Sequence, residues 1–328
     1  MLTFFTEHFF AVKIHKDLRN FNVVTPVVTV GIFDGVHLGH ITILNRLKNL
    51  ARKVKGETVI ITFWPHPRMA LVSEGSNLKY LNTLAEKQIL LDRSGIDHLV
   101  IIPFTKELSH YSAREFIKKI LVDMIGVKYL VVGYNHKFGK NRQGDFQTLF
   151  SCSEEYHFTV EQLDAKIVDE EKVSSTKIRE ALLSGRIKTA NSFLGYDYFL
   201  NGTIVAGKKI GRSIGFPTVN VLAEEDYKMI PRDGVYAVEL VLDGKTFRGM
   251  LNAGVRPTVN SGGEAKSIEV HIFNFDQEIY GQDITLIFKQ RIRDEKMFEN
   301  MEALAKQLKL DKQEALKILA KKNSDLYT

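Results

Sequence analysis

The stretch Val28-Thr29-Val30-Gly31-Ile32-Phe33-Asp34-Gly35-Val36-His37-Leu38-Gly39-His40 runs from an apolar segment through a glycine-rich turn into a helical pattern. Such a strand-turn-helix unit is typical of parallel α/β sheets. Its glycines allow backbone N–H groups to approach phosphate oxygens, and the helix N-terminus adds a positive dipole end. The two histidines flank Gly39 at that end, where they can donate hydrogen bonds to a triphosphate as charge builds on the leaving group. We therefore expect a phosphate site at this turn.

Around this segment, short apolar runs alternate with amphipathic ones, which indicates a parallel sheet covered by helices. The expected strands are 26–33, 58–63, 98–103, 128–133 and 156–162. Thr83 with Glu86 and Ser112 with Glu115 form capping boxes that predict helix starts. The first part is therefore expected to be a Rossmann-like, doubly wound α/β domain.

The pattern changes near Gly195 to short alternating runs separated by glycine. Residues 235–242, 267–275 and 283–292 alternate at period two, as half-buried antiparallel strands do. We expect a small antiparallel β-barrel followed by C-terminal helices, the last one capped by Asp311 with Glu314. The predicted domains are 1–188 and 189–328.

Composition is that of an ordinary globular protein of 328 residues, with 44% hydrophobic and 26% charged residues. The single cysteine, Cys152, excludes an intrachain disulfide. Met1–His8 has no cationic leader, and no segment approaches the roughly 18 apolar residues of a membrane span. These features predict a cytoplasmic protein without a membrane partner.

The formal net charge is +6, and residues 1–188 hold 26 basic against 20 acidic side chains, whereas residues 189–328 hold 19 of each. A basic surface can attract nucleic acid, but it can equally concentrate a small polyanion such as ATP. The simplest explanation is a solvated helix face. Its residues are Arg46, Lys48, Arg52, Lys53 and Lys55. A basic nucleic-acid-binding protein remains an alternative, although we expect no nucleic-acid partner.

Two simpler explanations compete for His37 and His40, namely a zinc site and helix capping alone. No nearby carboxylate or thiol completes an obvious zinc site, and the preceding strand and glycine turn favour phosphate chemistry. A second phosphate motif is expected where Ser174, Ser175 and Thr176 open a helix carrying Lys177 and Arg179. The hydroxyls can be plain N-caps. Cations in a first turn oppose the helix dipole, however, and an anionic ligand would offset that cost.

The segment from Gly31 to His40 resembles the His-x-Gly-His signature of the nucleotidyltransferase superfamily, and Ser174–Arg179 resembles its second phosphate motif. Thr62-Phe63-Trp64-Pro65-His66-Pro67-Arg68 and Val132-Gly133-Tyr134-Asn135-His136-Lys137-Phe138-Gly139 are similar to segments of the bacterial bifunctional riboflavin kinase/FAD synthetase family. The chain departs from the family pattern at Trp64, where an acidic residue is expected, and at Lys137 and Lys177, where arginine is commoner. Lysine lacks the bidentate fork of arginine.

This resemblance implies that the FMN phosphate attacks the α-phosphorus of ATP and that pyrophosphate leaves, assisted by Mg²⁺. His37, His40 and Arg179 would stabilise the ATP phosphates. The implied nucleotide-binding and flavin-binding residues are Gly31, Phe33, Asp34, Gly35, Gly39, His66, Asn135, Ser174, Ser175 and Thr176.

A second glycine loop opens the later domain: Gly207-Lys208-Lys209-Ile210-Gly211-Arg212-Ser213-Ile214-Gly215-Phe216-Pro217-Thr218-Val219-Asn220. It lacks the Gly-Lys-Ser/Thr ending of a Walker A loop, and by itself such a loop is more often a flexible hairpin. It resembles the riboflavin kinase pattern Gly-Arg-x-x-Gly-Phe-Pro-Thr-x-Asn. The resemblance implies that Thr218 and Asn220 bind Mg²⁺ with ATP. The implied nucleotide-binding residues are Gly207, Gly211, Arg212, Gly215 and Pro217.

In Ser267–Phe273, alternation puts Ile268, Val270 and Ile272 on one face and Glu269 with His271 on the other. Alternation alone favours a solvent-facing Glu269. The resemblance instead implies that Glu269 is the general base for the ribityl 5′-hydroxyl, with Arg293 on the flavin side.

The implied activity makes FMN from riboflavin and then FAD, with small molecules as the partners and the oligomeric state left open. Another nucleotidyltransferase fused to an unrelated barrel is the main enzyme alternative. A flavin sensor without catalysis is disfavoured, because all six residues implied in phosphate binding, Mg²⁺ binding and general-base catalysis are present. They are His37, His40, Arg179, Thr218, Asn220 and Glu269.

Overall fold

The computed structural model describes residues 12–67, 69, 79–164, 173–206, 211, 214–257 and 264–320. The chain forms two compact units, Met1–Ser174 and Ser175–Thr328. Met1–His8, where no leader is expected, lie outside the described residues. Within the described residues, no helix is long and apolar enough to cross a membrane.

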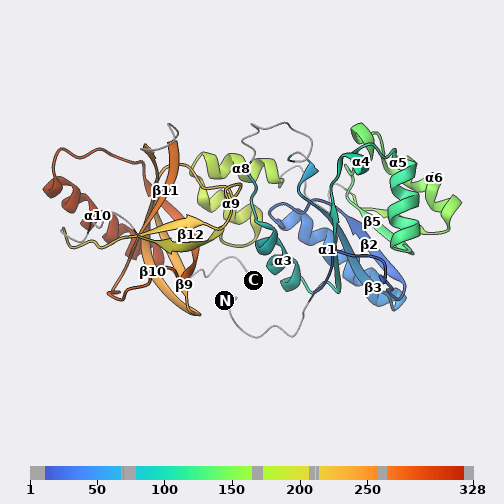
Figure 1. Ribbon diagram of the computed structural model, residues 1–328, viewed down its shortest axis with the longest axis horizontal. Coiled ribbons are helices and arrows are strands. Elements are labelled where there is room, and N and C mark those ends of the chain that lie inside the picture. Colours follow the sequence, from blue (N-terminus) through green and yellow to red (C-terminus); the bar gives the residue numbers. More distant parts are fainter. Residues whose placement is uncertain are drawn as a thin grey trace. The chain divides into compact units, whose positions relative to one another are not determined.

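The first unit contains a six-stranded sheet in the order β1-β4-β3-β2-β5-β6, with all pairs parallel (Figure 1). Its strands are β1 (Lys13–His15), β2 (Pro26–Val30), β3 (Glu57–Trp64), β4 (His98–Pro103), β5 (Tyr129–Val132) and β6 (Thr159–Gln162). The five predicted strands are confirmed, and β1 was not predicted. The strand expected over 26–33 ends at Val30, because Phe33 already has a left-handed φ of 51°.

Helices cover both faces of this sheet, α1 and α3 on one and α5 and α6 on the other (Figure 1). They are α1 (Leu38–Val54), α3 (Leu84–Arg93), α4 (Lys106–Ser109), α5 (Ala113–Phe116) with its π-helical continuation η1 (Ile117–Met124), the 3₁₀ turn η2 (Lys140–Arg142) and α6 (Phe146–Tyr156). The capping boxes of Thr83 with Glu86 and of Ser112 with Glu115 are both confirmed. Strand residues such as Val28 pack with η1 and α6 in one buried cluster that includes Cys152.

The order of the strands places β2 between β3 and β5. The chain moves outward from β2 to β3 and β4, and then returns to the opposite side of β2 for β5 and β6. The carboxyl ends of β2 and β5 therefore meet at a topological switch point, where doubly wound sheets bind their ligands. The glycine turn after Val30 and the turn containing Asn135 both follow these ends.

The second unit is built on a closed antiparallel barrel in the order β10-β11-β8-β7-β12-β9. Its strands are β7 (Phe199–Val205), β8 (Val219–Ala223), β9 (Gly234–Leu242), β10 (Lys245–Pro257), β11 (Glu264–Ile272) and β12 (Asp283–Arg293). Ile268, Val270 and Ile272 are buried, as their alternation predicts. Helices α8 (Ser175–Leu183) and α9 (Ile187–Leu194) precede the barrel, and α9 contacts β12.

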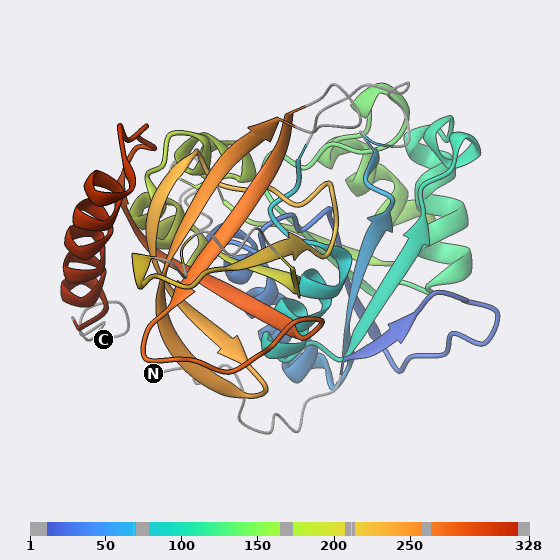
Figure 2. The same cartoon turned by 60° about the vertical axis from the view of Figure 1, so that its left-hand side comes forward.

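One long helix, α10 (Met301–Ala320), packs against β9, β10 and β12 on the outside of the barrel (Figure 2). The predicted start of a last helix at Asp311 with Glu314 is wrong, because α10 runs through both residues without interruption. Asp311 is 1% exposed and binds Arg293 at the end of β12. Its carboxylate is therefore used in a tertiary ion pair, and the described C-terminal part has one helix where several were expected.

Candidate active sites

The glycine turn between β2 and α1 is held by its backbone. The Gly31 N–H donates to the Ile61 carbonyl at 3.0 Å. Phe33, Gly35 and Val36 all have left-handed φ values, of 51°, 89° and 37°. A Cβ on Gly31 would lie 2.9 Å from the Phe33 ring, so a larger residue there would have to displace that buried ring. The turn thus delivers the first N–H groups of α1 to the switch point.

His37 and His40 stack at the start of α1, with ring centroids 3.7 Å apart and an interplanar angle of 17°. His37 is the N-cap, and its Nδ1 accepts the His40 backbone N–H at 3.4 Å. Since that nitrogen is an acceptor, neutral His37 carries its proton on Nε2. Capping explains only half of the pair, because His40 Nδ1 is buried without a hydrogen-bond partner among the described residues.

Both imidazoles are neutral at pH 7. Burial lowers the pKa of His37 to about 4. Burial also lowers the pKa of His40 well below its ordinary value, and His37 and Lys87 lower it further. Each ring therefore offers one N–H donor in a site of low polarity, where a hydrogen bond to a phosphate oxygen is strong.

Two buried charges lie beneath the turn. Asp34 is 4% exposed and accepts the Leu81 N–H at 3.1 Å and the Asn82 N–H at 3.4 Å. Lys87 on α3 is 3% exposed and its Nζ donates to the Ile32 carbonyl at 2.7 Å. Burial lowers the pKa of Lys87 to about 8, although Asp34 opposes the shift.

The sequence analysis missed Lys87. A signal was present, because Lys87 shares helical spacing with Leu90 and Leu91, and both leucines are buried. A lysine on the apolar stripe of a helix is rarely buried unless it is paired. Its proximity to the turn depends on the packing of α3, which periodicity does not reveal.

The other predicted residues of this site lie on loops. Asn135 is exposed in the turn that follows β5. His66 is half-buried, and its ring packs on Tyr80 with centroids 4.8 Å apart. Both loops follow the carboxyl ends of sheet strands, β5 and β3 respectively, which is where the resemblance implies a flavin nucleotide.

Two of the departures from the family pattern have local partners. The Trp64 ring lies 6.0 Å from Lys87 Nζ, so an aromatic face meets a buried cation where an acidic residue was expected. Lys137 pairs with Asp145 at 3.5 Å on the surface. Exposed pairs of this kind contribute about 0–1 kcal/mol, so Lys137 is only weakly held.

The second phosphate motif begins α8. Ser175 is the first residue of this helix, Thr176 and Lys177 are exposed, and Arg179 and Ser174 are half-buried. By its contacts α8 belongs to the second compact unit, where it packs on α9. The part of Arg179 in adenylyl transfer stays a prediction.

The loop of the second unit closes on itself. The Phe216 N–H donates to the Gly211 carbonyl at 2.9 Å, and Gly215 has a left-handed φ of 77°. A Cβ on Gly211 would lie 2.1 Å from the Phe216 carbonyl oxygen, so only glycine fits. The predicted residues Gly207 and Arg212 lie outside the described residues.

Three polar residues form a row across the barrel next to this loop. Glu269 on β11 lies opposite Asn220 on β8 and opposite Asn252 on β10. Directly opposed residues share a face of the sheet. Glu269 is half-buried, so its surroundings are neither bulk solvent nor the barrel interior. The Asn252 amide donates to Glu295 Oε1 at 2.9 Å.

Asn252 was not predicted as a site residue. Only the register of β10 places it beside the glutamate. On the same strand, a Cβ on Gly254 would lie 2.1 Å from Glu295 Oε1. The glycine therefore lets the loop after β12 approach the row closely.

Comparison with known proteins matches both units to separate family models. Residues 22–177 match the FAD synthetase model and residues 194–319 match the riboflavin kinase model. A bifunctional riboflavin kinase/FMN adenylyltransferase of Listeria monocytogenes is 36% identical, over 91% of this chain and 94% of its own length. The chain belongs to the bifunctional riboflavin kinase/FMN adenylyltransferase family.

A second relative and one solved structure are similar to this chain over nearly its whole length. The protein of the same name from Haemophilus influenzae is 36% identical, over 90% of this chain and 96% of its own. A solved structure from Streptococcus pneumoniae, titled a macrolide-efflux protein, has a TM-score of 0.82 and 30% identity. The structural match covers 93% of this chain and 99% of the chain in that structure. The bifunctional family architecture therefore spans nearly the whole chain.

Arg293, which family resemblance places on the flavin side, has its fork occupied. Its Nε and one terminal nitrogen donate to Asp311 at 2.9 and 2.7 Å, and another donates to the Asp294 carbonyl at 2.8 Å. Asp311 lies on α10, so the pair joins the end of β12 to the helix. In this member of the family the arginine anchors α10, and its flavin role stays a prediction.

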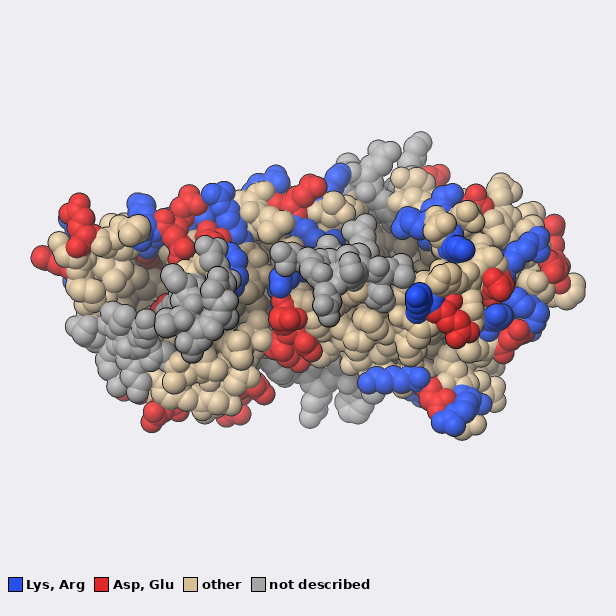
Figure 3. Space-filling model, turned by 45° about the horizontal axis from the view of Figure 1, so that its top comes forward, with Lys and Arg blue, Asp and Glu red and all other residues tan. Residues whose placement is uncertain are grey.

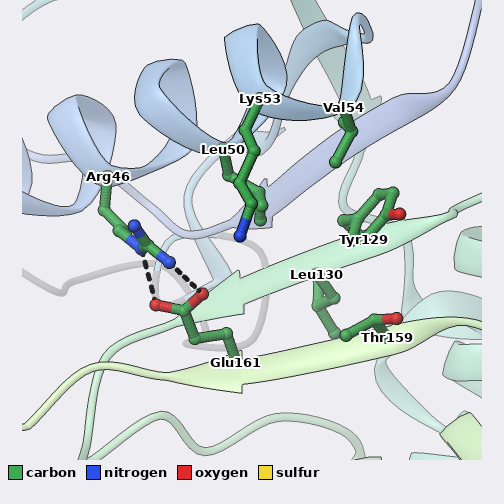
Figure 4. Close-up of a pocket in the computed structure, with 8 residues that line it drawn as sticks. All are labelled: Arg46, Leu50, Lys53, Val54, Tyr129, Leu130, Thr159 and Glu161. Atoms are coloured by element: carbon green, nitrogen blue, oxygen red, sulfur yellow. Dashed lines mark hydrogen bonds and ion pairs between the residues drawn. The ribbon is translucent and has the colours of Figure 1, made fainter.

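A groove of about 280 Å³ lies between α1 and strands β5 and β6, and none of its lining residues is a predicted site residue (Figure 4). It is lined by Arg46, Leu50, Lys53, Val54, Tyr129, Leu130, Thr159 and Glu161. Arg46 donates to both Glu161 oxygens, at 2.6 and 2.8 Å, which ties α1 to β6. Lys48 on the same helix donates to the Ser94 carbonyl at 2.7 Å. Arg46 and Lys48 of the basic face thus have partners within the protein.

Proposed function

We propose that the chain phosphorylates riboflavin with ATP to give FMN, and then transfers AMP from a second ATP to FMN, releasing FAD and pyrophosphate. The observation that carries the proposal is the match of one chain to an FAD synthetase model and a riboflavin kinase model in succession. A nucleotidyltransferase fused to an unrelated barrel would lack the second match. The two reactions are consecutive, since FMN is the product of the second unit and the substrate of the first.

In the adenylyltransferase unit, we assign the stacked histidines to the phosphates of ATP. FMN phosphate attacks the α-phosphorus and pyrophosphate leaves, so negative charge grows on the leaving group. The Nε2–H of His37, fixed by the cap hydrogen bond, is available to an oxygen of that group. Catalysis is then positioning and charge stabilisation without a covalent intermediate.

In the kinase unit, we assign Glu269 as the base that takes the ribityl 5′-hydroxyl proton while that oxygen attacks the γ-phosphorus of ATP. Its place between Asn220 and Asn252 supports the assignment, because two amides can hold neighbouring groups in register with the carboxylate. The proton moves to Glu269 and ADP leaves.

Mg²⁺ fits the Thr218 and Asn220 oxygens. No group of three His, Cys, Asp or Glu side chains suited to a metal occurs among the described residues. The Thr218 hydroxyl and the Asn220 amide supply oxygen ligands, and Mg²⁺ binds oxygen ligands together with substrate phosphates and retained water. When bound, Mg²⁺ would neutralise phosphate charge.

We further propose a functional boundary near residue 188, between the two family matches. We also propose a cytoplasmic location and small-molecule partners without nucleic acid. On the face shown in Figure 3, basic and acidic side chains are interspersed, which suits a solvated surface better than a nucleic-acid track.

The decisive experiment supplies purified protein with riboflavin and Mg-ATP and follows products by chromatography. FMN should form first and FAD second, and FMN supplied directly should give FAD. Folded protein that forms neither product would overturn the proposal. If supplied FMN gave FAD but riboflavin gave no FMN, only the adenylyltransferase assignment of the first unit would be supported.

A further inference from the structure

A buried histidine contacts the glycine loop that precedes β8 in the second unit. His271 on β11 is 7% exposed and its Nδ1 lies 2.8 Å from the Pro217 carbonyl oxygen. A carbonyl only accepts, so Nδ1 carries the proton and donates. Pro217 directly precedes Thr218, and β11 pairs with β8 through Val270 and Val219. One step further along this register sets His271 opposite Thr218.

The ring of His271 is clamped in one orientation. Phe216 and Phe273 pack against it, with centroids 5.1 and 5.6 Å away and interplanar angles of 62° in both cases. Its Nε2 is buried and has no hydrogen-bond partner among the described residues. The one polar contact of this imidazole is therefore the loop carbonyl, because no other group in the described part of the chain competes for it.

Burial favours the neutral form of this ring. Burial lowers the pKa of His271, the Pro217 hydrogen bond opposes that shift, and Lys312 on α10 adds to it. Lys312 is the charged group that faces the ring from α10, and its Nζ lies 5.3 Å from the Phe273 ring centroid. A neutral ring has one N–H, and the loop carbonyl uses it.

We infer that His271 is a positioning residue for riboflavin phosphorylation: its Nδ1–H holds the Pro217 carbonyl and so fixes the peptide that presents Thr218 and Asn220 to Mg-ATP. The inference rests on the proposed kinase function of this loop. Gly215, two residues before Pro217, has a left-handed φ of 77°, a conformation in which glycine adds backbone freedom. The His271 hydrogen bond restrains the direction of the Pro217 carbonyl at the end of this segment. His271 acts through the loop and does not touch the reacting atoms.

Two substitutions separate this role from packing. In His271→Asn the amide nitrogen is one bond beyond Cγ, as Nδ1 is, so the donor is kept. In His271→Gln the amide lies one bond further out, near the position of Nε2, although glutamine is closer to histidine in volume. A hydrogen-bonding role predicts that asparagine is the better replacement, whereas a packing role predicts that glutamine is.

The experiment measures both reactions of the full chain. His271→Gln should raise the KM for Mg-ATP in riboflavin phosphorylation by about tenfold, the effect of one lost hydrogen bond to a buried carbonyl. The KM for riboflavin should change much less. His271→Asn should remain within about threefold of the parent. FAD formation from FMN should match the parent in both variants.

The inference would be overturned if both variants lost riboflavin phosphorylation equally, or if His271→Gln were more active than His271→Asn. It would also be overturned if His271→Asn did not fold, or if the KM for Mg-ATP were unchanged in His271→Gln. Failure of the parent protein to phosphorylate riboflavin would instead overturn the proposed kinase function, so the two failures are distinguishable.

Discussion

We propose that the two glycine loops bind the same ligand group, phosphate, by different physical means. After β2, the turn leads into a helix, and α1 offers its N-terminal N–H groups together with two stacked, neutral histidines. After the Gly211–Pro217 loop, the chain enters strand β8, and the polar side chains form a row across three strands. In the proposed roles, the first site stabilises phosphate with donors, and the second presents oxygens and a carboxylate.

This difference follows from the secondary structure after each loop. A helix start concentrates unpaired N–H groups and a positive dipole end, so an anion is stabilised with little help from charged side chains. Barrel strands use their N–H groups in the ladder, so the second site depends on side chains in register. Substitution of a single catalytic side chain should therefore reduce activity most at the barrel site.

The largest effect is expected for Glu269→Gln. Glutamine keeps the size of the side chain but cannot take the ribityl proton, and general-base assistance contributes about 10²–10⁴ in rate. Riboflavin phosphorylation should fall by that factor, measured as initial FMN formation. FAD formation from supplied FMN is the control and should stay at the parental rate. Parental FMN formation would show that Glu269 is not the general base.

The next effect concerns stability of the barrel unit. Asp311→Asn leaves Arg293 without its anionic partner, and breaking a buried ion pair costs about 3–5 kcal/mol. Denaturant unfolding monitored within the second unit should show this loss. Combining the change with Arg293→Gln should cost less than the two single losses together. Strict additivity would mean that the pair does not anchor α10.

His40→Ala tests the helix-start site. Loss of one preorganised donor costs about 10²–10³ in rate, so FAD formation from FMN should fall by that factor while riboflavin phosphorylation is kept. Product formation from FMN and from riboflavin should be compared in one preparation. Equal loss of both activities would contradict separate sites.

A smaller contrast is expected in acid. The folded-state pKa of His37, about 4, is below its ordinary value of 6.5, so the unfolded chain takes up the proton first as the pH falls. The contribution of neutral His37 to the stability of the first unit should therefore be full above pH 6.5 and be lost between 6.5 and 4. The change is on the order of 3 kcal/mol from this residue.

The matched control for this contrast is His37→Asn, which keeps a good N-cap and removes the titration. Its unfolding free energy should depend less on pH across that window, measured by hydrogen exchange of α1. An identical pH profile in parent and variant would assign the acid sensitivity to other groups.

Local sequence patterns predicted much of this molecule. Period-two alternation placed Ile268, Val270 and Ile272 on one face, where all three are buried, and capping boxes located two helix starts. They failed at Asp311, where the same capping pattern occurs inside α10. A local pattern cannot show that a distant Arg293 binds the carboxylate instead, because ion pairs between strand and helix depend on packing.

By itself the sequence determined the order of the domains, the two glycine loops and the residue types that carry the chemistry, since these depend on neighbours along the chain. Only the tertiary structure decided which distant side chains support those loops. Lys87 reaches Ile32 across 55 positions, and His271 reaches Pro217 across 54. Asn252 joins Glu269 only through strand register. Such contacts require closed packing of separate elements, and the spacing of residues along the chain contains no measure of it.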